Sequence, residues 1–330
     1  MVSPTVVELF CGVGGMGLGF KQAGFNIVQS FDNNPHALEM HLTNFPECST
    51  KNINILELER VEGDIIIAGP PCQGFSQMGK QDLLDPRNHL IVHTAKIIIN
   101  SSPDYFVIEN VTGLITEKFA SIVKEVYSIL EQKYLITIHK LNSVDFGIPQ
   151  NRQRVFITGV KDNGVLKQPT KITPFSKKYT VRDAISDLPD QGEHEVPAIY
   201  KNRNAYNAEL QKNEGEITNC NTTKHSEEII ARFSKTEPGS KDLISHRNRL
   251  RWEQVSPTIL AGSLTTRRAA CWPIHPDLPR VITVREAARL SSFPDDFMFS
   301  RETYLATSQI GNAVPPKLAL AVAKSIQCVI

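Results

Sequence analysis

The sequence lacks the features that mark several large classes of protein. Its six cysteines include no Cys-x-x-Cys pair, so we expect neither a zinc ribbon nor a disulfide framework, and no metal site. It contains no secretory signal and no apolar run of about 18 residues, so we expect a cytoplasmic protein without a membrane span. It also contains no internal repeat. These absences leave an ordinary globular protein in a reducing compartment.

An excess of charge of one sign is also missing, because the 36 basic and 35 acidic residues leave a net charge of +1. We therefore expect no general attraction to nucleic acid. Between residues 232 and 268, however, eight Lys and Arg residues accompany only three acids, Glu237, Asp242 and Glu253. A solvated basic surface explains this local excess more simply than phosphate contacts do, so composition alone indicates no partner.

A cysteine follows directly after an apolar segment that predicts a buried strand. Residues 64–68 read Asp-Ile-Ile-Ile-Ala, and Gly-Pro-Pro-Cys72 comes next. In open α/β sheets ligands bind at the carboxyl ends of strands, and the two prolines stiffen this turn. A second apolar segment, 105–108, ends at Glu109. The pattern places a nucleophile and a proton donor at one edge of a sheet, although a lone cysteine is more often a small buried apolar residue.

A glycine-rich loop follows the first predicted strand, which ends at Phe10. Gly12, Gly14 and Gly17 satisfy the pattern G-x-G-x-x-G, which lets the backbone approach a ligand closely. Asp32 ends the next predicted strand, where an acid accepts hydrogen bonds from ribose hydroxyls. These residues alone fit a dinucleotide as well as another nucleoside cofactor.

Three later segments complete a set of motifs. They are Gln150-Asn-Arg-Gln-Arg154, the stretch 280–290 (RVITVREAARL) and Gln309-Ile-Gly-Asn-Ala-Val-Pro-Pro316. Together with Pro-Pro-Cys72-Gln, Glu109-Asn-Val and the glycine loop, they resemble the C-5 cytosine-specific DNA methyltransferases of bacterial restriction–modification systems. The resemblance covers nearly the whole chain outside residues 165–245.

The resemblance implies a reaction and assigns residues to it. Cys72 would attack carbon 6 of a cytosine flipped out of double-stranded DNA, and Glu109 would hold ring nitrogen 3. S-adenosyl-L-methionine would supply the methyl group for carbon 5 and leave as S-adenosyl-L-homocysteine. Arg154 would favour the thiolate, and Arg152 would support the loop or a phosphate. The cofactor-binding residues implied are Phe10, Gly12, Val13, Gly14, Gly15, Asp32, Asn33, Asn54, Ile55, Gly69, Pro71, Leu90, Asn312, Ala313 and Val314.

Two residues depart from the family pattern. Glu8 stands where the family often has Asp, and Asn54 stands where an Asp commonly contacts the adenine ring. An amide can also donate or accept a hydrogen bond there, so cofactor binding is still expected.

The first 160 residues alternate strand and helix patterns, which predicts an α/β fold with a doubly wound, mostly parallel sheet. By resemblance this sheet is the Rossmann-like type of the S-adenosylmethionine-dependent methyltransferases. We expect residues 1–175 to form a catalytic and cofactor-binding domain, 176–299 a smaller irregular target-recognition domain, and 300–330 to return to the first. Strands are expected near 5–10, 26–31, 64–68, 105–109, 134–140 and 154–160, and helices near 15–23, 35–43, 87–99 and 116–131.

The resemblance also implies double-stranded DNA as the partner. We expect a monomer, with any cognate restriction endonuclease as a separate protein. Two alternatives stay open: a tRNA cytosine methyltransferase of the same fold, whose Cys-Phe-Thr signature is absent here, and a dinucleotide-dependent oxidoreductase, which leaves the Cys72 motif unexplained. The candidate DNA-binding residues are Gln73, Ser76, Lys80, Arg87, Arg247, Arg249, Arg251, Thr258, Arg267 and Arg268.

Overall fold

The structure is a computed structural model that describes residues 3–75, 82–161, 178–188, 196–197, 204–211, 215–262 and 272–327. Its contacts divide the chain into two compact units. The first unit comprises Met1–Asn142, Gln153–Thr173 and Leu318–Ile330, and the second comprises Ser143–Arg152 and Pro174–Lys317. The second unit thus includes residues 143–152 and 300–317, which the expected boundaries placed in the first domain or its C-terminal return.

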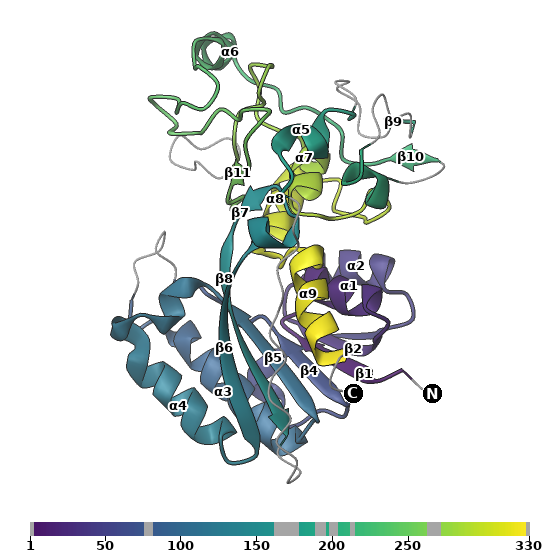
Figure 1. Ribbon diagram of the computed structural model, residues 1–330, viewed down its shortest axis with the longest axis vertical. Coiled ribbons are helices and arrows are strands. Elements are labelled where there is room, and N and C mark those ends of the chain that lie inside the picture. The colour runs from purple at the N-terminus through teal and green to yellow at the C-terminus, as the bar shows by residue number, and fades with distance from the viewer. Residues whose placement is uncertain are drawn as a thin grey trace. The chain divides into compact units, whose positions relative to one another are not determined.

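The first unit is built on a seven-stranded sheet with the strand order β3-β2-β1-β4-β5-β8-β6 (Figure 1). Neighbouring strands are parallel except at β8, which runs antiparallel to β5 and β6. The predicted α/β fold with a mostly parallel, doubly wound sheet is therefore confirmed. The strands are β1 (Thr5–Leu9), β2 (Asn26–Asp32), β3 (Ser49–Asn52), β4 (Ile65–Ala68), β5 (Tyr105–Asn110), β6 (Tyr134–Asn142) and β8 (Gln153–Lys161).

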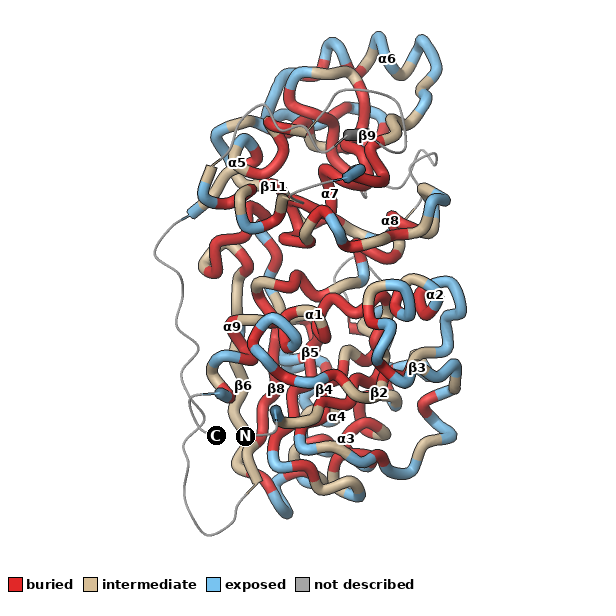
Figure 2. Tube along the Cα trace, turned by 90° about the vertical axis from the view of Figure 1, so that its right-hand side faces the viewer, coloured by how far each residue is buried: buried red, intermediate tan, exposed pale blue. Residues whose placement is uncertain are grey.

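Helices cover both faces of this sheet, with α3 and α4 on one face and α1, α2 and α9 on the other (Figure 1). Every residue of β4 and β5 is buried, and Figure 2 shows the buried colour running along both strands. Continuous apolar strands of this kind are expected where both faces are covered. No helix among the described residues is long and apolar enough to cross a membrane. The helices are α1 (Gly15–Gln22), α2 (Pro35–Asn44), α3 (His89–Ser101), α4 (Ala120–Leu130) and α9 (Pro316–Gln327).

The order of the strands reverses between β1 and β4. From β1 the chain continues to β2 and β3 on one side, whereas β4 and β5 lie on the other side. Ligands of open α/β sheets bind at such a switch point, beyond the carboxyl ends of the strands. The glycine loop follows β1 and the Pro-Pro-Cys segment follows β4, so both motifs flank this point.

The second unit has little regular structure in its described part, and buried polar contacts join its segments beside buried apolar side chains such as Trp272 and Phe293. Arg289 has no exposed surface and forms ion pairs of 2.6 Å with Asp295 and 3.4 Å with Asp187. Arg285 is equally buried and donates to the carbonyls of Thr218, Pro294 and Phe297. Its elements are α5 (Val181–Ile185), α6 (Glu227–Ser234), α7 (Val284–Leu290), α8 (Thr303–Asn312) and the short strand pairs β7 (Gln150–Asn151) with β11 (Ser256–Pro257) and β9 (Val196–Pro197) with β10 (Glu216–Ile217).

Candidate active site

Cys72 lies four residues beyond the end of β4, on a loop fixed to its neighbours. The Gly69 amide donates to the Leu9 carbonyl of β1 at 3.2 Å, and the Asn110 side chain donates to the Pro70 carbonyl at 3.2 Å. The Phe75 amide closes a turn by donating to the Cys72 carbonyl. Cys72 itself is half-buried. The thiol is therefore carried on a stiff segment beside the ends of β1 and β5.

Glu109 lies near the end of β5 and forms an ion pair with Arg154 of β8, with 2.8 Å between Nε and Oε1. Both side chains are largely buried, with exposures of 11% for Glu109 and 13% for Arg154. The adjacent, antiparallel strands bring the two residues together. We expected Arg154 to stabilise the Cys72 thiolate. The structure pairs this guanidinium with the carboxylate, which orients Glu109, and the effect of Arg154 on Cys72 stays a prediction.

A different arginine lies within electrostatic range of Cys72. The pKa of Arg87 is raised mainly by its hydrogen bond to Asp85, and the charge of the Cys72 thiolate contributes to the rise. The same bond to Arg87 lowers the pKa of Asp85 to about 2. A nearby positive charge favours a thiolate over a thiol. Arg87, predicted only as a DNA-binding residue, is thus a described cation whose charge acts on Cys72.

The glycine loop is tied to the ends of β1 and β2 by two carboxylates. Asp32 accepts from the Gly12 amide at 2.8 Å and from the Asn34 amide at 2.9 Å. Glu8, which is 1% exposed, accepts from the Gly17 amide at 3.0 Å. The acid of the glycine motif thus holds the loop itself, in addition to any contact with a ribose.

The surroundings of Gly12 fit a closely approaching ligand. Gly12 has φ +54°, and a methyl group built on it would meet no atom within 4 Å. Gly14 and Gly17 differ, because the same methyl group would lie 2.3 Å from Phe45 and 2.4 Å from the Glu8 carboxylate. Open space therefore lies above Gly12 and not above the other two glycines, as close contact with a nucleoside cofactor requires.

The other expected cofactor residues of the first unit occupy several environments. Asn33 is exposed, and Asn54 accepts a hydrogen bond from the Leu56 amide at the start of a 3₁₀ turn. Ile55 is only 3% exposed and packs in the apolar core, so its side chain does not line an open site. No group of three or more metal-ligating side chains occurs in the described ranges. Val13 and Gly15 are buried, whereas Phe10, Gly69, Pro71 and Leu90 are half-buried.

The Gln150–Arg154 motif is divided between the two units, because the first unit resumes at Gln153. Arg152, in the second unit, is 2% exposed and donates to the main-chain carbonyls of Ile259, Gly311 and Ala313, each at 3.0 Å. Arg152, which we expected to support a loop or a phosphate, thus has its guanidinium bound to main-chain carbonyls. It fixes the turn that carries Asn312, Ala313 and Val314.

The expected DNA-binding arginines of the second unit divide into buried and exposed residues. Arg249 donates to four main-chain carbonyls, those of Phe233, Thr236, Pro276 and Asp277, and Arg247 donates to the Trp272 carbonyl. Both are buried, so the expectation that they contact base edges is corrected: their guanidinium groups hold the backbone.

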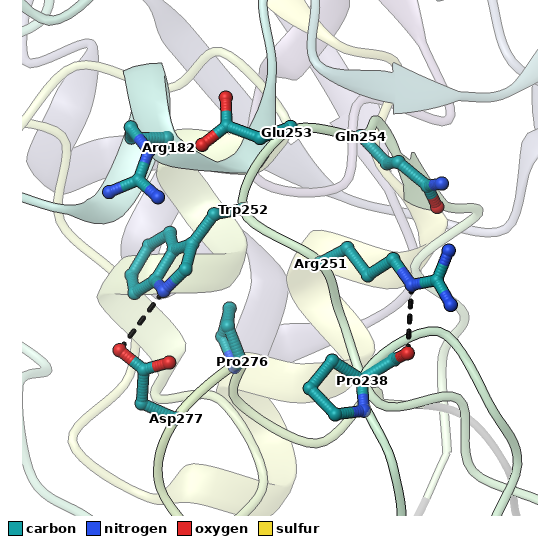
Figure 3. A pocket seen from close by; sticks show the side chains of 8 residues that line it. All are labelled: Arg182, Pro238, Arg251, Trp252, Glu253, Gln254, Pro276 and Asp277. Carbon is teal, nitrogen blue, oxygen red and sulfur yellow. Dashed lines mark hydrogen bonds and ion pairs between the residues drawn. The ribbon is translucent and has the colours of Figure 1, made fainter.

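Arg251 is exposed at the edge of a hollow of about 480 Å³, and its Nε donates to the Pro238 carbonyl (Figure 3). Among the remaining candidates, Gln73 and Arg87 are exposed, while Thr258 donates its hydroxyl to the Asn151 carbonyl at 2.7 Å. Ser76, Lys80, Arg267 and Arg268 lie outside the described residues.

Comparisons with known proteins agree with this geometry. The model of the C-5 cytosine-specific DNA methylase family matches residues 4–328. The chain belongs to this family. The methylase is 36% identical to the Type II methyltransferase M.XorII of Xanthomonas oryzae pv. oryzae, over 99% of this chain and 85% of that protein. It is 34% identical to M.MthTI of Methanothermobacter thermautotrophicus, over 98% of this chain and 96% of that protein.

Solved structures show the same fold. A prophage-encoded protein of E. coli matches 99% of both chains with a TM-score of 0.86 and 31% identity. DNMT2 of Spodoptera frugiperda matches with a TM-score of 0.67 at 19% identity, which shows a shared fold alone. The methylase is therefore a DNA cytosine-5 methyltransferase by family, and membership of this family implies the use of S-adenosylmethionine.

Proposed function

We propose that the methylase modifies carbon 5 of a cytosine flipped out of a specific double-stranded DNA sequence, through a covalent adduct with Cys72. The observation that carries this proposal is the Arg154-bound carboxylate of Glu109 at the end of β5, the strand next to the one that carries Cys72. A base within a duplex cannot reach such a site and must leave the stack.

The chemistry follows from these side chains. The Cys72 thiolate forms a bond to carbon 6 while Glu109, in its protonated form, gives its proton to ring nitrogen 3. The ring then carries no net charge, and carbon 5 becomes nucleophilic. Bound S-adenosylmethionine supplies an electrophilic methyl group. A base then removes the carbon 5 proton, and the bond between Cys72 and carbon 6 breaks.

The cofactor is proposed to lie on the glycine loop of the first unit. Gly12 offers open space, Asp32 keeps the loop in place, and Asn33 is exposed beside it. Asn312, Ala313 and Val314 lie in the second unit, on the turn that Arg152 fixes, and their contact with the cofactor stays a prediction. Asn54 already accepts a hydrogen bond from the Leu56 amide, so its amide nitrogen is the part proposed for contact with adenine.

The biological role proposed is protection of host DNA within a restriction–modification system, or that of an orphan methylase. The Type II methyltransferases to which the chain is similar support this role. A cognate endonuclease would be a separate protein, and the methylase would act as a monomer. Sequencing of the methylome of a host that expresses the gene would report the activity and the target together.

Replacement of the nucleophile tests the mechanism directly. Cys72→Ser should abolish methyl transfer to unmethylated DNA but leave S-adenosylhomocysteine binding near wild type, because Cys72 is not on the glycine loop. A duplex containing 5-fluorocytosine should trap a covalent complex with the wild type only, since fluorine blocks the final elimination. Cys220→Ala, at a cysteine buried in the second unit, is the control and should remain active. Appreciable turnover by Cys72→Ser, or transfer to tRNA in place of DNA, would contradict the proposal.

A further inference from the structure

Residues 238–251 of the second unit form a hairpin. The Gly239 amide donates to the Arg249 carbonyl at 2.8 Å, and the Arg249 amide donates to the Ser240 carbonyl at 2.8 Å. Lys241 and Asn248 pair next, and the Asp242 amide then donates to the Arg247 carbonyl. The two legs are thus hydrogen-bonded from the base of the hairpin to its tip.

The buried arginines stiffen this hairpin from within. Arg249 joins it to the carbonyls of Phe233, Thr236, Pro276 and Asp277, and Arg247 joins it to Trp272. At the base, the Trp252 indole donates to Asp277 at 3.0 Å, as Figure 3 shows. The hairpin is therefore a fixed element and not a loose loop.

The tip places polar groups inside and apolar groups outside. Asp242, which is 1% exposed, accepts from the Ser245 amide at 2.6 Å and forms an ion pair of 2.7 Å with Arg232. The turn that these bonds close presents Leu243, 89% exposed, and Ile244, 50% exposed. Two adjacent aliphatic side chains held outward on a fixed turn indicate a surface that meets a partner.

The charges around the tip favour a polyanion as that partner. Lys235, Lys241, His246 and Arg251 are exposed along the hairpin and the segment before it. The acid within the tip, Asp242, is buried and paired, while Glu237 at the base is exposed. Proteins that bend or unstack DNA insert aliphatic side chains between base steps from elements with this combination of charges.

We infer that the hairpin 238–251 is a DNA wedge. Leu243 and Ile244 enter a groove and contact the bases through apolar surface, while Lys241 and Arg251 neutralise phosphates on either side. The inference rests on the proposed function, since it takes duplex DNA as the substrate. It assigns base contact to two aliphatic residues and gives the neighbouring Arg247 and Arg249 the task of holding them in place.

The test compares apolar and charged substitutions at the tip. Leu243→Ala with Ile244→Ala should weaken binding to a duplex that contains the methylated sequence by roughly tenfold, with an unchanged salt slope, because apolar contact releases no counterions. Lys241→Ala should weaken all sequences alike and reduce the salt slope by about one. Leu42→Ala, at a leucine that is 47% exposed on α2, is the matched control and should bind as the wild type does.

A lysine at both tip positions separates a wedge from a surface that rests on the phosphates. Leu243→Lys with Ile244→Lys should weaken binding if the side chains must enter the groove, and tighter binding by this variant would overturn the inference. Wild-type affinity for DNA in the variant Leu243→Ala with Ile244→Ala would also overturn the inference. So would a variant that still binds DNA but no longer binds a partner protein, because the tip would then be a protein-binding surface. Unchanged fluorescence of Trp252 and Trp272, which both belong to the second unit, shows that this unit is folded in each variant. If the wild type methylates DNA and the tip variants bind DNA as the wild type does, only the wedge is refuted. If the wild type does not methylate DNA, the proposed function is refuted.

Discussion

Two glycines of the first loop, Gly12 and Gly17, are required for different physical reasons. Gly12 has a backbone conformation that costs other residues about 1–2 kcal/mol, but it has empty space in front of it. Gly17 has an ordinary helical conformation, but a side chain there would collide with the buried carboxylate of Glu8. In this motif, Gly12 leaves space for a ligand, whereas Gly17 leaves space for the Glu8 side chain of the neighbouring strand β1.

This difference leads to a prediction about two alanine variants. Gly17→Ala should lower the free energy of unfolding by about 1–3 kcal/mol, because its methyl group displaces Glu8 and overpacks the site. Gly12→Ala should cost about 1–2 kcal/mol through its backbone conformation and also lose most of its affinity for S-adenosylhomocysteine, since its methyl group enters the open space. Urea denaturation of the ligand-free protein and calorimetric titration measure the two quantities. Wild-type affinity in Gly12→Ala would show that the cofactor lies elsewhere.

Two arginines two residues apart should behave in opposite ways. Arg249→Ala should destabilise the second unit by about 3 kcal/mol or more, because four carbonyl groups lose a charged donor. Arg251→Ala should leave stability near wild type, weaken DNA binding to all sequences alike and flatten the salt slope. Thermal unfolding and salt-dependent affinity distinguish them. A stable Arg249→Ala variant with an altered methylation motif would restore the original expectation that Arg249 reads bases.

At the scale of elements, the sequence predicted what apolar patterns encode. The six expected strands and four expected helices of the first 160 residues are all present. The sequence did not predict β3. This edge strand is polar and its side chains are largely exposed, so no apolar pattern marks it. The arginine-rich segment 247–252 forms no regular strand, since Asn248 and Arg249 form isolated bridges only.

The candidate site was predictable only as far as its motifs extend. Cys72 and Glu109 follow from their positions at strand ends, which the sheet order confirms. The pairing of Arg154 with Glu109 and the charge of Arg87 near Cys72 depend on side-chain packing, which no local pattern specifies. The burial of Arg247 and Arg249 was missed for the same reason, since an arginine-rich segment favours an exposed surface.

At the scale of the molecule, the two units differ in how their buried charges are held. The first unit contains a large apolar core beneath α3 and α4. The second combines buried apolar side chains such as Trp272 with buried ion pairs, among them Arg280 with Glu286 of α7, at 2.9 Å and almost fully buried. Burial raises the pKa of Glu286, but its bonds to Arg280 lower that pKa further, so the net change is downward. In Asp242 the Ser245 and Arg232 bonds likewise outweigh burial and lower the pKa.

Acid should therefore unfold the second unit before the first. A carboxylate with a lowered pKa contributes stability that is complete above its ordinary value, 4.5 for Glu286 and 3.8 for Asp242, and is lost as the pH falls through its folded value. Burial lowers the pKa of one histidine in each unit, His139 and His225, so protonation below pH 6.5 weakens both units. Below about pH 4.5, protonation of Glu286 and Asp242 removes further stability from the second unit.

The two tryptophans of the chain, Trp252 and Trp272, both belong to the second unit, so their fluorescence reports on it separately. On acidification the fluorescence should change at a higher pH than the circular dichroism of the sheet in the first unit. Glu286→Gln should make the fluorescence transition less steep, because one titrating group is removed. Arg87→Ala is the control: its partner Asp85 titrates near pH 2 in an exposed ion pair, which contributes little to stability. Coincident transitions in the wild type would mean that the units unfold together and that these ion pairs do not determine the acid limit.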